Sequence, residues 1–312
     1  MTRIRKAVIP AAGMGTRQYP ASGGLPKGMF TVVDRDGLTK AAIQIVVEEV
    51  QASGIEAICI VVRPGDEELY QRYFTPISGE RRPAFARHAW ALEQSEYLGR
   101  LREMITYVPQ PTPHGYGHAV YCAREWVDDE PFLLLLSDHA FISDVSQPCA
   151  RQLIDVFEQC GQSVYALQRI SEDRLRFFGT IQGEKVQENP PVYRLTHIRE
   201  KPDVAYARQH FRVEGVPDGM YLSFFGQHAL TPGIFDALEY HIRHDIREQG
   251  EFQLTSAQEF LRRQEGAYGC EIQGESHDMG IPLGLLEAQV ALAIHGVNRS
   301  QIARALHGLL HQ

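Results

Sequence analysis

The chain has 312 residues, of which 44% are hydrophobic, and its formal net charge is -8 at pH 7. A chain of this length buries a full core without disulfides or a structural metal. Because an acidic protein lacks the basic surface that neutralises nucleic-acid phosphates, we expect small-molecule substrates and no nucleic-acid partner. The longest apolar run, Phe132–Leu136, is far shorter than the roughly 20 residues that span a bilayer, so no membrane segment or membrane partner is predicted.

The first residues are not expected to form a secretion signal, because their apolar stretch has about half of the ~7–15 residues required and contains Pro10. We interpret this stretch as a buried strand. The cysteines are odd in number and widely spaced, without a close pair of the metal-binding or redox kind; they are Cys59, Cys122, Cys149, Cys160 and Cys270. They are predicted to be buried thiols of a cytoplasmic protein.

Short apolar runs rich in Val and Ile alternate with amphipathic stretches in the first half of the chain. The pattern predicts strands at Ala7–Pro10, Ala57–Val62 and Phe132–Leu136. It predicts helices at Thr39–Ser53 and Ala119–Val127. Such alternation is typical of an α/β fold with a Rossmann-like, mostly parallel sheet flanked by helices. Sheets of this kind bind ligands beyond the carboxyl ends of their strands, so the residues after each run are site candidates.

Shorter strands with fewer intervening helices follow from about residue 163, at Ser163–Ile170, Val192–Arg199 and Tyr221–Phe225. They predict a second, partly antiparallel half of the same sheet, which makes the sheet mixed. Closing helices are predicted at Pro282–His295 and Ser300–Leu310, the latter with a periodic apolar face.

One domain is therefore predicted, with a catalytic part at residues 1–281 and closing helices of the same domain at 282–312. The charged and aromatic-rich stretch at residues 76–102 is predicted to be an inserted helical excursion.

The segment AAGMGTR places small residues directly after the first strand, where backbone N–H groups can approach an anion without a Cβ in the way. It is a candidate phosphate loop, and the alternative is a simple turn; its candidate residues are Ala11, Ala12, Gly13, Gly15, Thr16 and Arg17. A dinucleotide fingerprint would need a third glycine where Gln18 stands, and the Gly-Lys-Ser/Thr ending of an ATPase P-loop is absent. These differences argue against a dehydrogenase and a P-loop ATPase.

Cations are needed where negative charge shifts onto a leaving pyrophosphate, and Arg17 and Lys27 can supply them. Solvated surface positions are the alternative for both. A Mg²⁺ ion is typically held by one or two carboxylates. Asp138 directly follows an apolar strand, and this position at the carboxyl end of the strand would place its carboxylate over a ligand cleft. The alternative for Asp138 is a cap or turn residue. His241 and His244 have a spacing that suits a metal, but their polar stretch favours a solvated helix face.

Several segments together resemble the motifs of bacterial UTP–glucose-1-phosphate uridylyltransferases, a group of sugar nucleotidyltransferases. In chain order they are KAVIPAAGMGTR, LPKGM, GYGHAVYCARE, FLLLLSDH, REKPD, GEFQLT and HDMGIPLG, from about residue 4 to about residue 295. The resemblance implies the nucleotide-diphospho-sugar transferase type of fold. It also implies the joining of a nucleoside triphosphate, with UTP expected, to a sugar 1-phosphate, with glucose 1-phosphate expected. Homo-oligomers are usual among such proteins, so one is expected here.

The same resemblance implies roles for further residues. Asp138 matches the magnesium ligand, and Asp278 is implied as a second carboxylate for Mg²⁺. Lys201 would neutralise the sugar phosphate, although a solvated strand end is the alternative. Pro202 predicts an extended backbone at Lys201. On the sugar side the implied residues also include Glu200 and Gly179, and on the base side they are Ala11, Ala12, Gly13, Gln110, Gly115 and Gly117. Gln110 offers an amide donor and an acceptor, with a surface loop position as the alternative.

Three positions depart from the pattern. Gly28 stands where an acid follows the lysine, His139 replaces the second aspartate of a Gly-Asp-Asp motif that reads Ser-Asp-His here, and Ile281 replaces an acid before the proline. The lost acid beside Asp138 predicts weaker magnesium binding or a changed substrate. The same chemistry with another base or sugar, such as thymidylyl or cytidylyl transfer, therefore stays open, as does a catalytically silent nucleotide-sugar-binding regulator.

Overall fold

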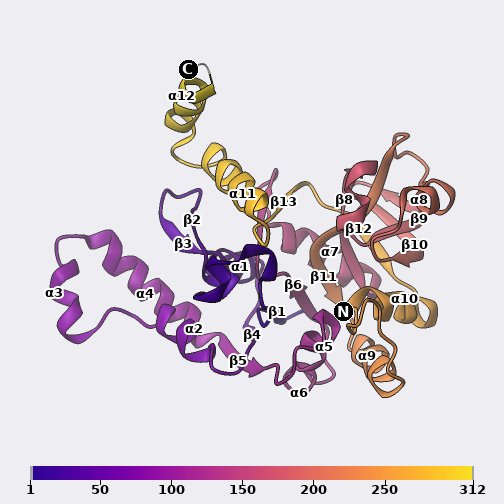
Figure 1. Cartoon of the computed structure of the whole chain (residues 1–312), viewed down its shortest axis with the longest axis horizontal. Coiled ribbons are helices and arrows are strands. Elements are labelled where there is room, and N and C mark those ends of the chain that lie inside the picture. Colours follow the sequence, from indigo (N-terminus) through magenta and orange to yellow (C-terminus); the bar gives the residue numbers. More distant parts are fainter. Residues whose placement is uncertain (1–2, 311–312) are drawn as a thin grey trace.

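A nine-stranded mixed sheet forms the centre of the molecule in a computed structural model that describes residues 3–310. Its strand order is β5-β4-β1-β6-β11-β8-β12-β10-β9 (Figure 1). The strands are β1 (Lys6–Pro10), β4 (Ala57–Val62), β5 (Ile105–Pro109), β6 (Phe132–Leu135), β8 (Val164–Ser171), β9 (Thr180–Glu188), β10 (Pro191–Arg199), β11 (Met220–Leu230) and β12 (Tyr268–Glu271).

The sheet has a parallel half and a mainly antiparallel half, as predicted. Strands β5, β4, β1 and β6 run parallel, with Ala7 of β1 opposite Ile58 and Leu133. Strand β11 then pairs antiparallel with β6 and with β8, while β12 runs parallel to β8 and β10 antiparallel to β12. The parallel strands β1, β4 and β6 are buried on both faces, which explains their continuous apolar runs, whereas the edge strand β5 is partly exposed.

Helices cover both faces of the sheet. On one face α1 (Ala42–Ala52) and α7 (Cys149–Cys160) bury their apolar sides, including Val46 and Leu153, against the strands. On the other face lie α5 (Tyr116–Tyr121), α9 (Gly233–Arg243) and α10 (Leu254–Glu265). The remaining α-helices are α2 (Glu67–Tyr73), α3 (Arg82–Phe85), α4 (Ala89–Glu103), α6 (Arg124–Val127), α8 (Val204–His210), α11 (Pro282–Ile294) and α12 (Arg299–Leu310).

Two predicted helices differ from the structure. Residues Thr39–Ala41 form strand β3, because they pair with β2 (Thr31–Val33) before the helix begins at Ala42. The helix predicted at 119–127 is two short helices, α5 and α6. At this break the backbone changes to the tighter i→i−3 hydrogen bond, which Ala123 donates to Val120.

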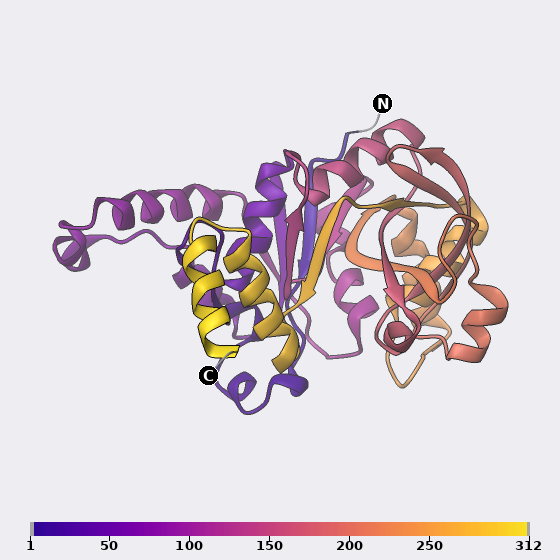
Figure 2. The same ribbon diagram turned by 90° about the horizontal axis from the view of Figure 1, so that it is seen from above.

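The predicted excursion and closing helices are confirmed. Figures 1 and 2 show α3 and α4 as an arm that projects from the parallel half of the sheet. Figure 2 shows α11 and α12 side by side at the end of the chain. The division at residue 281 remains a prediction, and residues 1–2 and 311–312 of the two predicted ranges lie outside the described residues.

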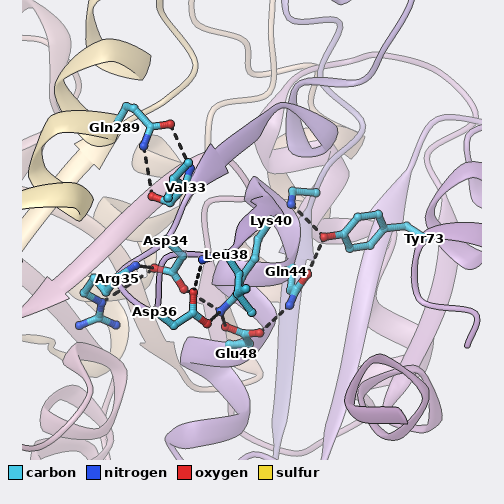
Figure 3. A network of polar contacts seen from close by, with 11 residues as sticks. Val33, Asp34, Arg35, Asp36, Leu38, Lys40, Gln44, Glu48, Tyr73 and Gln289 are labelled. Carbon is cyan, nitrogen blue, oxygen red and sulfur yellow. Dashed lines mark hydrogen bonds and ion pairs between the residues drawn. The ribbon is translucent and has the colours of Figure 1, made fainter. Parts of the chain in front are cut away.

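A buried polar network links the β2–β3 hairpin to α1 and α2 (Figure 3). The Lys40 ammonium lies 2.8 Å from Asp34, 2.7 Å from Asp36 and 2.8 Å from Glu48, and only 7% of its side chain is exposed. Glu48 also accepts a hydrogen bond from Gln44. These carboxylates raise the pKa of Lys40, although its burial acts in the opposite direction.

Other predictions about single residues have mixed outcomes. Cys59, Cys149 and Cys270 are buried, whereas Cys122 and Cys160 are half-buried; all are free thiols. His241 is buried beside Phe260 of α10, so the predicted solvated face is wrong for His241 and holds for the exposed His244. Among residues 3–310, no helix is both long and apolar enough to cross a bilayer.

Candidate active site

The predicted phosphate loop lies at the carboxyl end of β1. Its start is fixed by the Ala11 amide, which donates to the Val61 carbonyl over 2.7 Å. Gly15 has φ +64°, a left-handed backbone that favours glycine. The side-chain nitrogen of Gln18, Nε2, then donates to the Met279 carbonyl over 2.8 Å. Gln18, which stands where a dinucleotide fingerprint needs glycine, therefore joins this loop to the turn after β13 (Gly274–Asp278).

Lys27 and Asp138 form an ion pair near this loop. Asp138 follows β6 and is buried, while the Lys27 side chain is mostly buried. Burial acts to raise the pKa of the Asp138 carboxyl, but the Lys27 ammonium holds that pKa below its usual range. Asp138 is therefore an ionised carboxylate at neutral pH, which a metal ligand must be.

Asp278 is brought next to Asp138 by a short antiparallel ladder. Strand β13 pairs with β7 (His139–Ser143), and the ladder sets Asp278 opposite His139. Arg17 lies 3.7 Å from the Asp278 carboxylate, and 61% of the Arg17 side chain is exposed. The structure thus gathers Arg17, Lys27, Asp138 and Asp278, which are far apart in the sequence.

Gly280 lies against both carboxylates, so a larger residue there would collide with them. A Cβ at this position would lie 2.3 Å from Asp138 Oδ2 and 2.8 Å from Asp278 Oδ1. Carboxylate oxygens of this kind suit a hard divalent cation, which prefers oxygen ligands. No group of three or more His, Cys, Asp or Glu side chains in residues 3–310 could hold a metal, so a cation here would also need oxygens from a ligand or water.

His139 lies beside this carboxylate pair, where an acid was expected. Its Nδ1 is 2.8 Å from the Ser276 hydroxyl, and its Nε2 is 3.9 Å from Asp278. Burial lowers the pKa of the His139 imidazole, so the ring is neutral at neutral pH. The site therefore carries one negative charge fewer than an acid at residue 139 would give.

Gly28 also has a structural explanation. A Cβ at Gly28 would lie 3.0 Å from the hydroxyl of Tyr70, a fully buried residue of α2. A larger side chain at residue 28 would press on this buried ring. For Ile281, which precedes α11, the structure gives no explanation.

The predicted sugar-side residues form a second group. Glu200 accepts a 2.7 Å hydrogen bond from Thr255 of α10 and lies 3.1 Å from the Lys201 ammonium. A Cβ at Gly179 would lie 2.7 Å from the Phe224 ring and 3.2 Å from Glu200, so a larger residue would collide there. Thr255 was not predicted, although its GEFQLT segment carried part of the resemblance.

The backbone prediction at Lys201 is wrong. Lys201 has φ +40°, a left-handed conformation that is uncommon for lysine, instead of the extended conformation expected before Pro202. Its amide donates to the Phe178 carbonyl over 3.2 Å, which fixes this turn beside Gly179. Such strain is typical of positions that the surrounding structure holds for function. Among the contacts of residues 3–310, none joins Lys201 to Asp138 or Asp278.

The predicted base-side residues lie at the carboxyl end of β5. Gln110 is buried, and its amide nitrogen lies 3.1 Å from the Gly115 carbonyl. Gly117 donates a 2.8 Å hydrogen bond to the Phe252 carbonyl, and a Cβ at Gly117 would lie 2.7 Å from that oxygen. Gly115 and Gly117 thus allow the Glu251–Phe252 segment to approach this loop closely. Phe252 was not predicted, because this contact is visible only in the fold.

Comparison with known proteins identifies the family. A model described as nucleotidyl transferase matches residues 6–293. The chain is 33% identical over 294 residues to UTP–glucose-1-phosphate uridylyltransferase 2 of Staphylococcus saprophyticus, covering 94% of this chain and 93% of the relative. It is 31% identical over 313 residues to UTP–glucose-1-phosphate uridylyltransferase of Bacillus subtilis, covering 100% and 99%.

Solved structures agree with the sequence comparison. The structure of a UDP-glucose pyrophosphorylase complexed with UDP-glucose has a TM-score of 0.74 and 27% identity, covering 92% of this chain and 98% of that one. The UTP-bound UGPase from Acinetobacter baumannii has a TM-score of 0.76 and 25% identity, covering 97% and 98%. The chain therefore belongs to the nucleotidyl transferase family.

Proposed function

We propose that the protein is a UTP–glucose-1-phosphate uridylyltransferase, which joins UTP and glucose 1-phosphate and releases pyrophosphate. The observation that carries this proposal is the pair of carboxylates at Gly280, beside Lys27 and the loop of small residues. The relatives of this chain that are named UTP–glucose-1-phosphate uridylyltransferase match it over nearly its whole length, which also supports the proposal.

In the proposed reaction a phosphate oxygen of glucose 1-phosphate attacks the α-phosphorus of UTP in line, forming one P–O bond as the bond to pyrophosphate breaks. The residues do not form a covalent intermediate; they position the reactants and neutralise charge. The backbone of Ala11, Ala12, Gly13, Gly15 and Thr16 would approach the triphosphate. Arg17 is exposed enough to turn toward the triphosphate, and Lys27 would neutralise charge on the leaving group.

Lys201 would bind the phosphate of glucose 1-phosphate, while Glu200 would accept hydrogen bonds from sugar hydroxyls. Two observations support these roles: Glu200 is held by Thr255, and Lys201 is held in a strained conformation with part of its side chain exposed. The backbone of Gly179, which lies against Glu200, would approach the sugar ring.

Enzymes of the nucleotidyl transferase family generally use a divalent metal. We infer that this metal is Mg²⁺ and that Asp138 and Asp278 would hold it. When bound, Mg²⁺ would neutralise phosphate charge and help to orient the phosphates. Because His139 is neutral, we expect weaker Mg²⁺ binding than an acid at residue 139 would give.

The test is pyrophosphate release by the purified protein with Mg²⁺ and glucose 1-phosphate, with UTP, dTTP, CTP, ATP and GTP compared. Release with UTP as the preferred triphosphate is expected. Preference for another triphosphate would reassign the base, and activity only with another sugar phosphate would reassign the sugar. Tight nucleotide-sugar binding without pyrophosphate release would contradict the proposal and identify a regulator.

Lys201→Ala is expected to raise the KM for glucose 1-phosphate by about tenfold to a hundredfold, because a charge-assisted contact to phosphate is lost. The Kd for UTP, measured by calorimetry, should stay within about threefold of the wild-type value. The matched control is Lys185→Ala, which removes a lysine that forms an exposed pair with Glu188. Equal losses of affinity for both substrates would contradict the proposed role of Lys201.

Homo-oligomerisation, a cytoplasmic location and the division at residue 281 remain predictions.

A further inference from the structure

Gln110 is fixed at the carboxyl end of β5 by a backbone hydrogen bond to the neighbouring strand β4. It follows β5, its backbone amide donates to the Val62 carbonyl over 2.8 Å, and only 6% of the residue is exposed. Strand β5 is separated from β1 only by β4, so Gln110 and the loop after β1 lie at the same edge of the sheet. Its side-chain amide can present either an oxygen or an N–H group to a ligand, and a nucleobase would distinguish the two.

The Gly115 carbonyl is the first of two groups that orient this amide. Gln110 Nε2 lies 3.1 Å from that oxygen, which can only accept a hydrogen bond, so the nitrogen must face it. The carbonyl also accepts from the Ala119 amide of α5 over 3.1 Å. Gly115 has φ +108°, and a Cβ there would lie 2.7 Å from Glu251, so the backbone is confined. The acceptor is therefore fixed in place.

His118 provides a second acceptor for the same amide. Its Nδ1 lies 3.0 Å from Gln110 Nε2, and Nδ1 can accept only when the imidazole is neutral and carries its proton on Nε2. Burial lowers the pKa of His118, with the neighbouring His114 acting in the same direction and a hydrogen bond with the Thr112 backbone opposing it. A neutral ring is thus expected at neutral pH.

Together the two acceptors use both N–H groups of the Gln110 amide. Within residues 3–310 no group donates to its Oε1. The amide therefore offers a bound ligand a hydrogen-bond acceptor and no donor. Uracil carries a hydrogen on N3 and can donate to such an oxygen, whereas N3 of cytosine is itself an acceptor and would be repelled.

We propose that His118 is a positioning residue that holds Gln110 with Oε1 toward the nucleobase and so makes the site select uracil over cytosine. The inference rests on the proposed function, in which Gln110 lies beside the base. Without the His118 acceptor, the second amide hydrogen of Gln110 becomes free to turn toward N3 of cytosine. Discrimination should then fall while UTP is still accepted.

The experiment compares kcat/KM for UTP and for CTP, each with glucose 1-phosphate, in the wild type, His118→Leu and His118→Asn. Leucine and asparagine have nearly the same shape, but only asparagine places an acceptor oxygen near the Nδ1 position. His118→Leu is expected to lower the UTP:CTP ratio by about tenfold to a hundredfold, the range for one mismatched buried hydrogen bond. His118→Asn should keep most of the wild-type ratio.

An unchanged ratio in His118→Leu, or an equal fall of the ratio in both variants, would overturn the inference. If turnover is too slow to measure, the Kd values of UDP and CDP from calorimetry give the same ratio, and melting temperatures identify a variant that does not fold. A wild type that neither turns over UTP nor binds UDP would contradict the proposed function. A wild type that uses UTP, with an unchanged ratio in the leucine variant, would contradict only the role of His118.

Discussion

Asp138→Asn is expected to lower kcat for pyrophosphate release by roughly 10³-fold, because the neutral amide cannot hold a divalent cation or balance Lys27. The side chain is buried and pairs directly with the Lys27 ammonium, so solvent cannot replace the lost charge. The measurement is pyrophosphate release at saturating UTP and glucose 1-phosphate over a series of Mg²⁺ concentrations.

Asp144→Asn is the matched control, because Asp144 is exposed just beyond the far end of β7. Its activity should match the wild type. If Asp138→Asn melts normally and keeps more than about a third of wild-type activity, Asp138 does not have the proposed role. If high Mg²⁺ concentrations fully restore the activity of Asp138→Asn, the only role of Asp138 is to increase the affinity for the metal.

Lys40→Met is expected to lower the free energy of unfolding by about 3–5 kcal/mol, because it leaves carboxylates in the network of Figure 3 without their cation. Asp34 is as buried as Lys40, so water cannot easily replace the ammonium there. Urea unfolding followed by circular dichroism measures the change.

Arg194→Met is the control for a surface pair, since Arg194 and Glu184 are both mostly exposed. It should leave the free energy of unfolding close to the wild-type value, because exposed ion pairs contribute little. Adding Asp34→Asn to Lys40→Met should recover part of the loss, because one unpaired charge is removed. A loss below about 1 kcal/mol in Lys40→Met would mean that the carboxylates reach solvent once the lysine is gone.

The sequence predicted the features that depend on local pattern. The parallel strands β1, β4 and β6 are continuous apolar runs, so their positions and the place of Asp138 after β6 followed from hydrophobicity alone, whereas the partly exposed β5 was not predicted. Pairings between short polar strands could not be predicted in this way. Strand β13 reads GESHD and has no alternating pattern, so the pairing that sets Asp278 opposite His139 was not visible.

Tertiary contacts explain the other differences. The rule for residues before proline failed at Lys201, where the Phe178 carbonyl fixes a left-handed turn. Gly115 and Gly117 were predicted to lie beside a nucleotide, but the space their missing side chains leave is filled by Glu251 and Phe252. Their place beside a nucleotide remains a prediction, and the packed structure shows why this loop needs glycine.

The ladder between β7 and β13 also has a consequence for biosynthesis. It joins residues 139–143 to residues 274–278, so Asp278 cannot reach Asp138 until most of the chain has left the ribosome. The parallel strands β1, β4 and β6 can pair much earlier, because all of them lie in the first 135 residues. Contacts between distant segments form late and slowly. A nascent chain would therefore carry the paired strands β1, β4 and β6 well before it acquired the second carboxylate of the proposed metal site, and a protein that needs this carboxylate would remain inactive until its synthesis was nearly complete.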